Sequence, residues 1–285
     1  MKKVCYGLVG QNIVHSRSPE IFARIFDRFH MEGTFSLFDY STDELPNIIP
    51  QLSRLDGFSV TIPHKQTIMK FLDTMAPEAA SIAAVNSVKV FNGRMEGYNT
   101  DWTGFLFGLE GAVHSAKKVL VIGYGGAARA VLYALLRTMS DGEVSVLARD
   151  IAKATNLLSC YLIGKSAKVT LNILRPNQLS CDESFDLIIN CTPVGEGNQR
   201  ENSPLSRDFL FCGNPSVYDL VYHPPLTTFL ADAQRAGCRI INGLPMLVSQ
   251  AVESYRLWSG DITDVGELTA DILRSMLESE SKGKR

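Results

Sequence analysis

Apolar residues along the first hundred positions recur with two different periods. Short runs with a two-residue period are typical of half-buried strands, and longer runs with helical spacing are typical of amphipathic helices. The strand pattern is found at 4–9, 34–40 and 58–62, and the helix pattern at 18–29 and 43–52. Because the two patterns alternate, we predict an α/β layer with a largely parallel sheet.

The pattern changes at Asn86, after which Asn92-Gly93 separates two alternating runs. Asn-Gly in this setting is a strong signal for a two-residue hairpin turn. A helix is predicted at 101–109, and a second α/β series then begins at Lys118. Its predicted strands are 118–122, 143–147, 168–171, 186–189, 216–221 and 239–241. One helix is predicted to end at 137, one to begin at 151 and one to end at 236, and two final helices cover 245–258 and 265–277. The predicted fold class is therefore α/β throughout.

Composition and charge argue against several classes of partner. Lys and Arg total 28, Asp and Glu total 30, and the net charge of −2 provides no attraction to nucleic acid or acidic lipid. The apolar segment 119–136 contains three glycines and Arg129, so we interpret it as strand, loop and helix rather than a membrane span. A small-molecule partner follows by elimination.

The six cysteines are scattered, with no Cys-x-x-Cys pair and no histidine at metal-ligand spacing. We therefore expect reduced, mostly buried thiols in a cytoplasmic protein, and no metal site. The N-terminal apolar run is interrupted at Gln11 and Asn12, too early for a signal peptide, and is predicted to form the first strand.

A dinucleotide-binding loop is predicted in VLVIGYGGAARAV. Gly123, Gly125 and Ala128 follow a strand and open a helix with Gly-x-Gly-x-x-Ala spacing. The first glycine would make a tight turn, the second would let the backbone approach a pyrophosphate, and the alanine would allow close packing of helix on strand. The flanking strand and helix are the context that this short motif requires, and a purely structural glycine turn is the alternative.

The residues after the next strand, Ala148, Arg149 and Asp150, bear on the choice of cofactor. An acidic residue at this strand end favours the 2′-hydroxyl of NAD, whereas arginine and lysine suit the 2′-phosphate of NADP. Arg149, with Lys153 one helical turn later, favours NADP. Asp150 keeps NAD as an alternative, unless it caps the following helix.

Several other polar residues admit both a structural and a functional interpretation. Ser18 before a proline is a natural N-cap, yet Ser16 and Ser18 at a helix N-terminus also suit a carboxylate. Thr100 or Asp101 could cap the helix that begins there, or Asp101 could face a basic partner. Asn86 and Asn99 are equally ambiguous.

The strand at 58–62 carries Ser59 and Thr61 on its polar face, and a proline ends it just before His64 and Lys65. By strand alternation the two hydroxyls point to the side that Lys65 enters. Lys65 alone could be a solvated strand end, and we expect His64 to be a surface loop residue. None of the five histidines has a Ser or Cys partner at a nucleophile elbow, which gives little support to a hydrolase.

Seven motifs in the chain together resemble the shikimate dehydrogenase family, including its quinate/shikimate dehydrogenase relatives. HSRSP, VTIPHK, AVNSV, GYNTDWTG, GYGGAARA, INCTPVG and INGLPMLVSQA occur in the family's order and approximate spacing. The resemblance implies a substrate-binding catalytic domain at 1–102, completed by helices at 243–285, and a Rossmann-like, doubly wound NADP-binding domain at 103–242. It also implies reversible NADPH-dependent reduction of 3-dehydroshikimate to shikimate, in chorismate and aromatic amino-acid biosynthesis. The sequence leaves monomer and homodimer open.

The resemblance assigns roles by position. Lys65 and Asp101 would form the catalytic acid–base pair. The substrate-binding residues would be Ser16, Ser18, Ser59, Thr61, Asn86, Tyr222 and Gln250. The cofactor-binding residues would be Gly123, Gly125, Gly126, Ala127, Arg149, Lys153, Asn190, Thr192, Gly243 and Met246. When a hydride arrives, negative charge develops on the substrate oxygen, and a positioned ammonium that donates a proton stabilises that transition state.

Three stretches depart from the family pattern. Ser59 stands where the family usually has asparagine, which leaves the preference between shikimate and quinate open. Residues 148–150 read ARD in place of the usual NRT, and GQN near Gly10 replaces a Gly-x-Pro. Two alternatives follow: an NAD-dependent quinate/shikimate dehydrogenase, and a catalytically silent protein that senses a dinucleotide and a metabolite.

Overall fold

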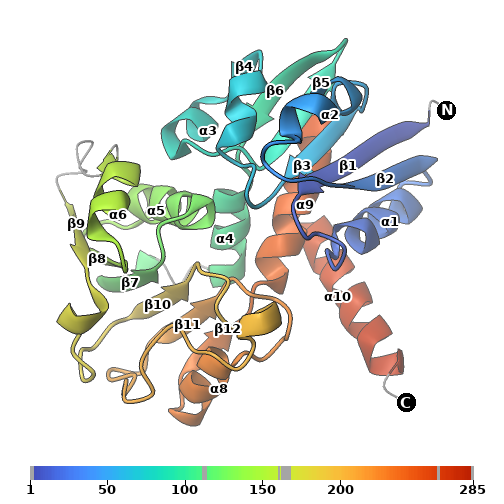
Figure 1. Ribbon diagram of the computed structural model, residues 1–285. Coiled ribbons are helices and arrows are strands. Elements are labelled where there is room, and N and C mark those ends of the chain that lie inside the picture. Colours follow the sequence, from blue (N-terminus) through green and yellow to red (C-terminus); the bar gives the residue numbers. More distant parts are fainter. Residues whose placement is uncertain (1–2, 111–113, 160, 162–167, 262–263, 284–285) are drawn as a thin grey trace. The chain divides into compact units, whose positions relative to one another are not determined.

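The computed structural model describes residues 3–110, 114–159, 161, 168–261 and 264–283 (Figure 1). The chain divides into two compact units, residues 1–104 with 247–285, and residues 105–246. It passes from one unit to the other within α4 (Asp101–Leu109) and α9 (Leu244–Ser259). Within the described ranges, no helix is both long and apolar enough to cross a membrane.

The first unit is built on a six-stranded mixed sheet with the order β2-β1-β3-β5-β6-β4. Its strands are β1 (Val4–Gly10), β2 (Gly33–Asp39), β3 (Gly57–Val60), β4 (Thr74–Met75), β5 (Ser87–Phe91) and β6 (Arg94–Tyr98). β1 is parallel to β2 and β3, whereas β5 is antiparallel to β3 and β6. The predicted hairpin is confirmed, since Asn92 and Gly93 between β5 and β6 have φ of 52° and 77°, as a type I′ turn requires.

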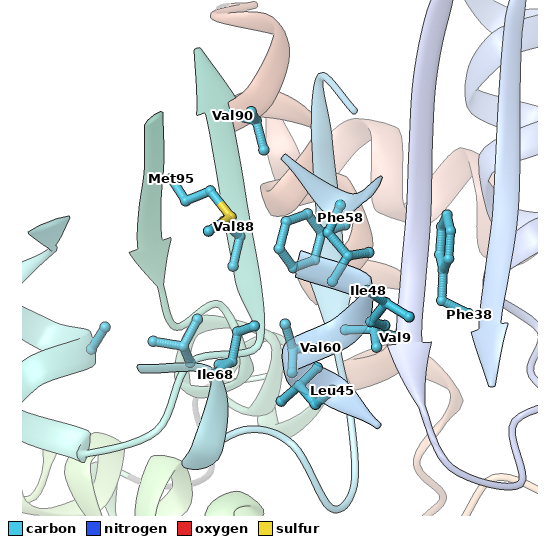
Figure 2. Packing of buried hydrophobic residues seen from close by; sticks show 13 residues of the cluster. Val9, Phe38, Leu45, Ile48, Phe58, Val60, Ile68, Val88, Val90 and Met95 are labelled. Atoms are coloured by element: carbon cyan, nitrogen blue, oxygen red, sulfur yellow. The ribbon is translucent and has the colours of Figure 1, made fainter. Parts of the chain in front are cut away.

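Apolar side chains cover both faces of this sheet. Its helical elements besides α4 and α9 are α1 (Ser18–Arg28), α2 (Leu45–Leu52), η1 (Thr67–Phe71), α3 (Pro77–Ile82) and α10 (Val265–Gly283). On one face, Leu45 and Ile48 of α2 pack with Phe58 of β3 (Figure 2). On the other, the Tyr6 ring of β1 lies 4.9 Å from the Trp258 ring of α9. Burial from both sides explains why every residue of β3 is buried.

The second unit is built on six parallel strands in the order β12-β11-β10-β7-β8-β9. They are β7 (Lys118–Ile122), β8 (Gly142–Leu147), β9 (Val169–Leu174), β10 (Leu187–Asn190), β11 (Ser216–Asp219) and β12 (Arg239–Ile241). The helical elements are α5 (Gly126–Thr138), α6 (Ile151–Leu157), η3 (Pro176–Gln178), η4 (Gly197–Gln199) and α8 (Thr228–Arg235). This is the Rossmann order, which reverses direction between β7 and β10, and the predicted fold class is confirmed.

Three expectations about strand length and burial are wrong. The strand predicted at 58–62 ends at Val60, because the chain then turns with the His64 N–H bonded to the Thr61 carbonyl, which leaves Ile62 66% exposed. His64 is fully buried rather than on the surface, and its Nε2 donates to the Tyr40 carbonyl at 2.8 Å.

The thiols are also not mostly buried. Among the described cysteines Cys238 alone is buried, Cys181 is exposed and the other three are half-buried. Cys181 lies in the loop before β10, where no core surrounds it. Cys160 lies outside the described residues.

Candidate active site

Polar side chains of the first unit gather at one edge of its sheet. β1 and β3 end at this edge, antiparallel β5 begins there, and β6 ends there. The segments that enter or leave the sheet at this edge carry Ser16, Ser18, Thr61, Lys65, Asn86 and Asp101. Residues far apart in the sequence therefore meet at the carboxyl ends of parallel strands, the usual place for a ligand site in an α/β fold.

An ion pair between Lys65 and Asp101 dominates this edge. The Lys65 Nζ donates to Asp101 Oδ2 at 2.6 Å, and the side chains are only 16% and 6% exposed. The Lys65 loop is held by a backbone hydrogen bond from Val85 N–H to the Lys65 carbonyl at 2.8 Å, while Asp101 is the first residue of α4. The interpretation of Lys65 as a solvated strand end is therefore wrong.

An amide network fixes the Asp101 carboxylate from its other side. Asn86 Nδ2 lies 2.9 Å from Asp101 Oδ1 and 3.2 Å from Gln250 Oε1, and the Asn86 Oδ1 accepts the Thr100 N–H at 2.6 Å. The Asp101 N–H donates to Asn99 Oδ1 at 3.1 Å. The carboxylate thus faces a basic partner, as one of the two sequence interpretations required, and both its oxygens accept hydrogen bonds.

Ser254 belongs to the same network and was not predicted. Thr100 Oγ1 donates to the Gln250 carbonyl at 3.0 Å and lies 3.2 Å from Ser254 Oγ. Gln250 and Ser254 are one helical turn apart on α9, and both are buried. Two polar residues with a spacing of four, which places them on one face of α9, were the available signal.

The two serines before α1 lie together, with their hydroxyl oxygens 3.2 Å apart. The Ser18 N–H donates to Ser16 Oγ at 3.2 Å, and Ser18 is the first residue of the helix. The interpretation of Ser18 as the N-cap is therefore wrong, because the helix begins at Ser18 itself and Arg17 occupies the N-cap position.

Ser59 and Thr61 occupy different environments. Ser59 is 5% exposed within the paired part of β3, between Leu8 and Ser87. Thr61 lies beyond the end of the strand and is half-buried. Its methyl carbon packs against Gly10, where an added Cβ would lie only 2.4 Å from it.

The glycine loop of the second unit has the shape that a pyrophosphate needs. Gly123 has φ of +105°, and a Cβ there would lie 2.9 Å from Thr192 Cγ2. A Cβ on Gly125 would meet no atom within 4 Å, so packing does not require a glycine there. Because Gly125 has no side chain, a ligand can approach the N-terminus of α5, whose first residues are Gly126 and Ala127. These residues fit the phosphates of a dinucleotide.

At the end of β8, Asp150 is the N-cap of α6, and its Oδ1 accepts the Lys153 N–H at 3.0 Å. Its carboxylate thus has the capping role that was one of its two interpretations. Arg149 and Lys153 are exposed, and neither forms an ion pair with another described residue. Two free cations beside a capped helix suit an additional phosphate better than a ribose hydroxyl.

The loop after β10 is organised by buried Asn190. Its Oδ1 accepts the N–H of Thr192 at 3.0 Å and the Thr192 hydroxyl at 2.7 Å, and its Nδ2 donates to Asp219 Oδ1 at 2.9 Å. Sequence reasoning missed Asp219, which is fully buried. Burial raises the pKa of its carboxyl to about 6, although hydrogen bonds from Thr227, Val221 and Asn190 act in the opposite direction.

The remaining predicted residues of this unit lie in and near the segments after β11 and β12. The Gly243 N–H donates to the Val221 carbonyl at 3.1 Å, next to half-buried Tyr222. A Cβ on Gly243 would lie 2.0 Å from the Leu220 carbonyl oxygen, so only glycine fits. Met246, 7% exposed, is in the first turn of α9.

Comparison with known proteins bears on these residues. Residues 8–88 match the family model for the shikimate dehydrogenase substrate binding domain. The NADP⁺-dependent shikimate dehydrogenase of Caldanaerobacter subterraneus subsp. tengcongensis is 36% identical over 263 residues, which cover 91% of this chain and 92% of the relative.

Two solved structures share the fold over nearly the whole chain. A chorismate mutase/shikimate 5-dehydrogenase fusion protein from Clostridium acetobutylicum has a TM-score of 0.86 at 30% identity, covering 98% of this chain and 99% of the other. Shikimate 5-dehydrogenase from Thermus thermophilus, solved with NADP(H) and shikimate, has a TM-score of 0.81 at 32% identity, covering 95% and 99%. The chain belongs to the shikimate dehydrogenase family.

Proposed function

We propose that the protein is an NADP-dependent shikimate dehydrogenase that reversibly reduces 3-dehydroshikimate to shikimate, in chorismate and aromatic amino-acid biosynthesis. The observation that carries the proposal is the Lys65–Asp101 ion pair, with Nζ and Oδ2 only 2.6 Å apart and both side chains largely buried. A protein that only senses metabolites has no need of a proton donor held in this way, so the pair favours an enzyme.

Lys65 is the proposed proton donor. NADPH supplies the hydride that reduces the substrate carbonyl. The Lys65 ammonium donates a proton to the oxygen on which negative charge develops, and in the reverse direction the amine takes that proton back. Asp101 holds the Lys65 Nζ in one position. The Asp101 carboxylate is itself kept from rotating, because Oδ2 accepts from Lys65 and Oδ1 accepts from Asn86.

The first unit supplies the proposed substrate-binding residues. Paired hydroxyls of Ser16 and Ser18 suit the substrate carboxylate. The ring oxygens would be bound by Thr61, Asn86 and Gln250, and the family resemblance adds Ser59 and Tyr222 to the proposed substrate-binding residues. We propose the domain bounds that the family resemblance implies, 1–102 with 243–285 for substrate and 103–242 for cofactor, which differ from the two compact units at 103–104 and 243–246.

The second unit supplies the proposed NADP-binding residues. Gly123, Gly125, Gly126 and Ala127 would hold the pyrophosphate at the N-terminus of α5. The exposed cations Arg149 and Lys153 would bind the 2′-phosphate, and Asp150 leaves them free because it caps α6. Four residues would line the nicotinamide side: Asn190, Thr192, Gly243 and Met246.

An assay with paired substrates and cofactors tests the proposal. Purified protein is given shikimate or quinate with NADP⁺ or NAD⁺, and formation of reduced nicotinamide is followed by absorbance. We expect shikimate with NADP⁺ to give the highest kcat/KM. Highest activity with quinate and NAD⁺ would instead identify a quinate/shikimate dehydrogenase, and ligand-induced stabilisation without turnover in all combinations would identify a sensor.

The setting of the enzyme is part of the proposal. Free thiols at the five described cysteines suit a reducing compartment, and we propose a cytoplasmic enzyme. We propose a monomer or a homodimer, which light scattering of the purified protein distinguishes.

A further inference from the structure

Asp219, at the carboxyl end of β11, is surrounded by hydrogen-bond donors. Its Oδ1 accepts from Asn190 Nδ2 at 2.9 Å and from the Val221 N–H at 3.1 Å. Its Oδ2 accepts from the Thr227 hydroxyl at 2.7 Å. The side chain is fully buried, so these contacts take the place of water.

Each of these donors fixes a different segment. Asn190 holds Thr192, whose methyl group occupies the space that a side chain on Gly123 would need. The Val221 carbonyl accepts the Gly243 N–H at 3.1 Å, which connects the segment after β12 to the segment after β11. Thr227 caps α8 by accepting the Leu230 N–H at 3.2 Å. The carboxylate thus joins the ends of β10 and β11 and the N-cap of α8 directly, and the segment after β12 through Val221.

Resting on the proposed function, we propose that Asp219 is a positioning residue for the nicotinamide half of NADP. Its carboxylate holds in register the segments that carry Asn190 and Thr192, Tyr222, and Gly243. It acts through these residues, because its own side chain is fully buried.

The charge of Asp219 is not explained by stability. Burial raises the pKa of the carboxyl to about 6, so at neutral pH the folded protein holds a charge that its surroundings disfavour. An amide of the same shape would avoid this cost but could not accept from every donor, because one of its two ends is an NH₂ group. Only a carboxylate accepts from all three donors, and so only a carboxylate holds all three segments.

The test compares Asp219→Asn with wild type, using two probes in calorimetric titrations. NADP⁺ reports on the whole cofactor, and adenosine 2′,5′-bisphosphate reports on the half without nicotinamide. We expect the variant to bind NADP⁺ about tenfold more weakly, the scale of one charge-assisted hydrogen bond, with unchanged affinity for the bisphosphate. The matched control is Asp186→Asn at the amino end of β10, where the carboxylate accepts the Lys117 and Lys118 N–H groups at 2.8 Å.

Equal affinity of Asp219→Asn and wild type for NADP⁺, or equal losses for both probes, would overturn the inference. Wild type that binds NADP⁺ but oxidises neither shikimate nor quinate would overturn the proposed function alone. Wild type that binds neither probe would overturn both.

A measurement on wild type decides the matter if the variant does not fold. As the pH falls through about 6, protonation of Asp219 removes an acceptor, so the ratio of NADP⁺ affinity to the affinity for 2′-phospho-ADP-ribose, which lacks nicotinamide, should fall. The 2′-phosphate and the pyrophosphate diester are common to NADP⁺ and 2′-phospho-ADP-ribose and cancel in the ratio, whereas the 5′-phosphate monoester of the bisphosphate would itself titrate at about pH 6. The titratable groups facing Asp219 are Cys191 and Glu196, and His223 faces Glu196. A ratio independent of pH would contradict the proposal.

Discussion

The Lys65–Asp101 pair is the residue-scale feature on which catalysis depends. Lys65→Ala removes the ammonium 2.6 Å from Asp101 Oδ2, and we expect kcat to fall at least about 10²-fold while shikimate still binds. Initial rates and a separate binding titration measure the two effects. Lys70→Ala, which removes an exposed lysine from η1, is the matched control and should keep wild-type kcat. Full activity of Lys65→Ala would exclude lysine from the chemistry.

The residue before Lys65 is predicted to control stability. His64 is fully buried and donates from Nε2 to the Tyr40 carbonyl at 2.8 Å. His64→Ala would leave that carbonyl without a donor and open a cavity, which together should lower the free energy of unfolding by about 2–4 kcal/mol. His64→Gln, which retains an N–H donor, should lose less. Denaturant unfolding measures both, and equal losses would show that the hydrogen bond contributes nothing.

At the scale of elements, local periodicity was enough to predict most strands and helices, but not their exact ends. The β5–β6 hairpin was predictable because Asn-Gly determines its own turn. Elements η1, β4 and α3 were not predicted, since a two-residue strand and short helices have too few positions to show a period. Partners distant in sequence account for the other misses: the burial of His64 depends on Tyr40, and Asp219 meets Asn190 only once β10 and β11 are paired.

The turn between β8 and α6 is the element that should set cofactor preference. Replacing Arg149 and Lys153 together with serine removes both cations, each worth about 1.5–3 kcal/mol in a hydrogen bond to phosphate. We therefore expect kcat/KM for NADP⁺ to fall roughly 10²-fold or more while that for NAD⁺ changes little. Retention of the α6 cap by Asp150 keeps the turn folded in this variant. Parallel losses with both cofactors would mean that the 2′-phosphate binds elsewhere.

At the scale of the whole molecule, Asp219 should couple folding to pH. Burial raises the pKa of its carboxyl from 3.8 to about 6, so the folded chain binds this proton more tightly than the unfolded chain does. The stability that the proton contributes is complete below the unfolded-state pKa and is lost as the pH rises through about 6.

Asp219→Asn cannot ionise and should escape this loss. Its Tm relative to wild type should therefore become more favourable between about pH 5 and pH 7.5, even if its Tm at one pH is lower because a hydrogen bond is missing. Calorimetric scans of both proteins across this range, with Asp186→Asn as the control, measure the difference. A relative Tm that worsens as the pH rises would mean that the Asp219 charge stabilises the fold, and its retention would then need no explanation in terms of the cofactor.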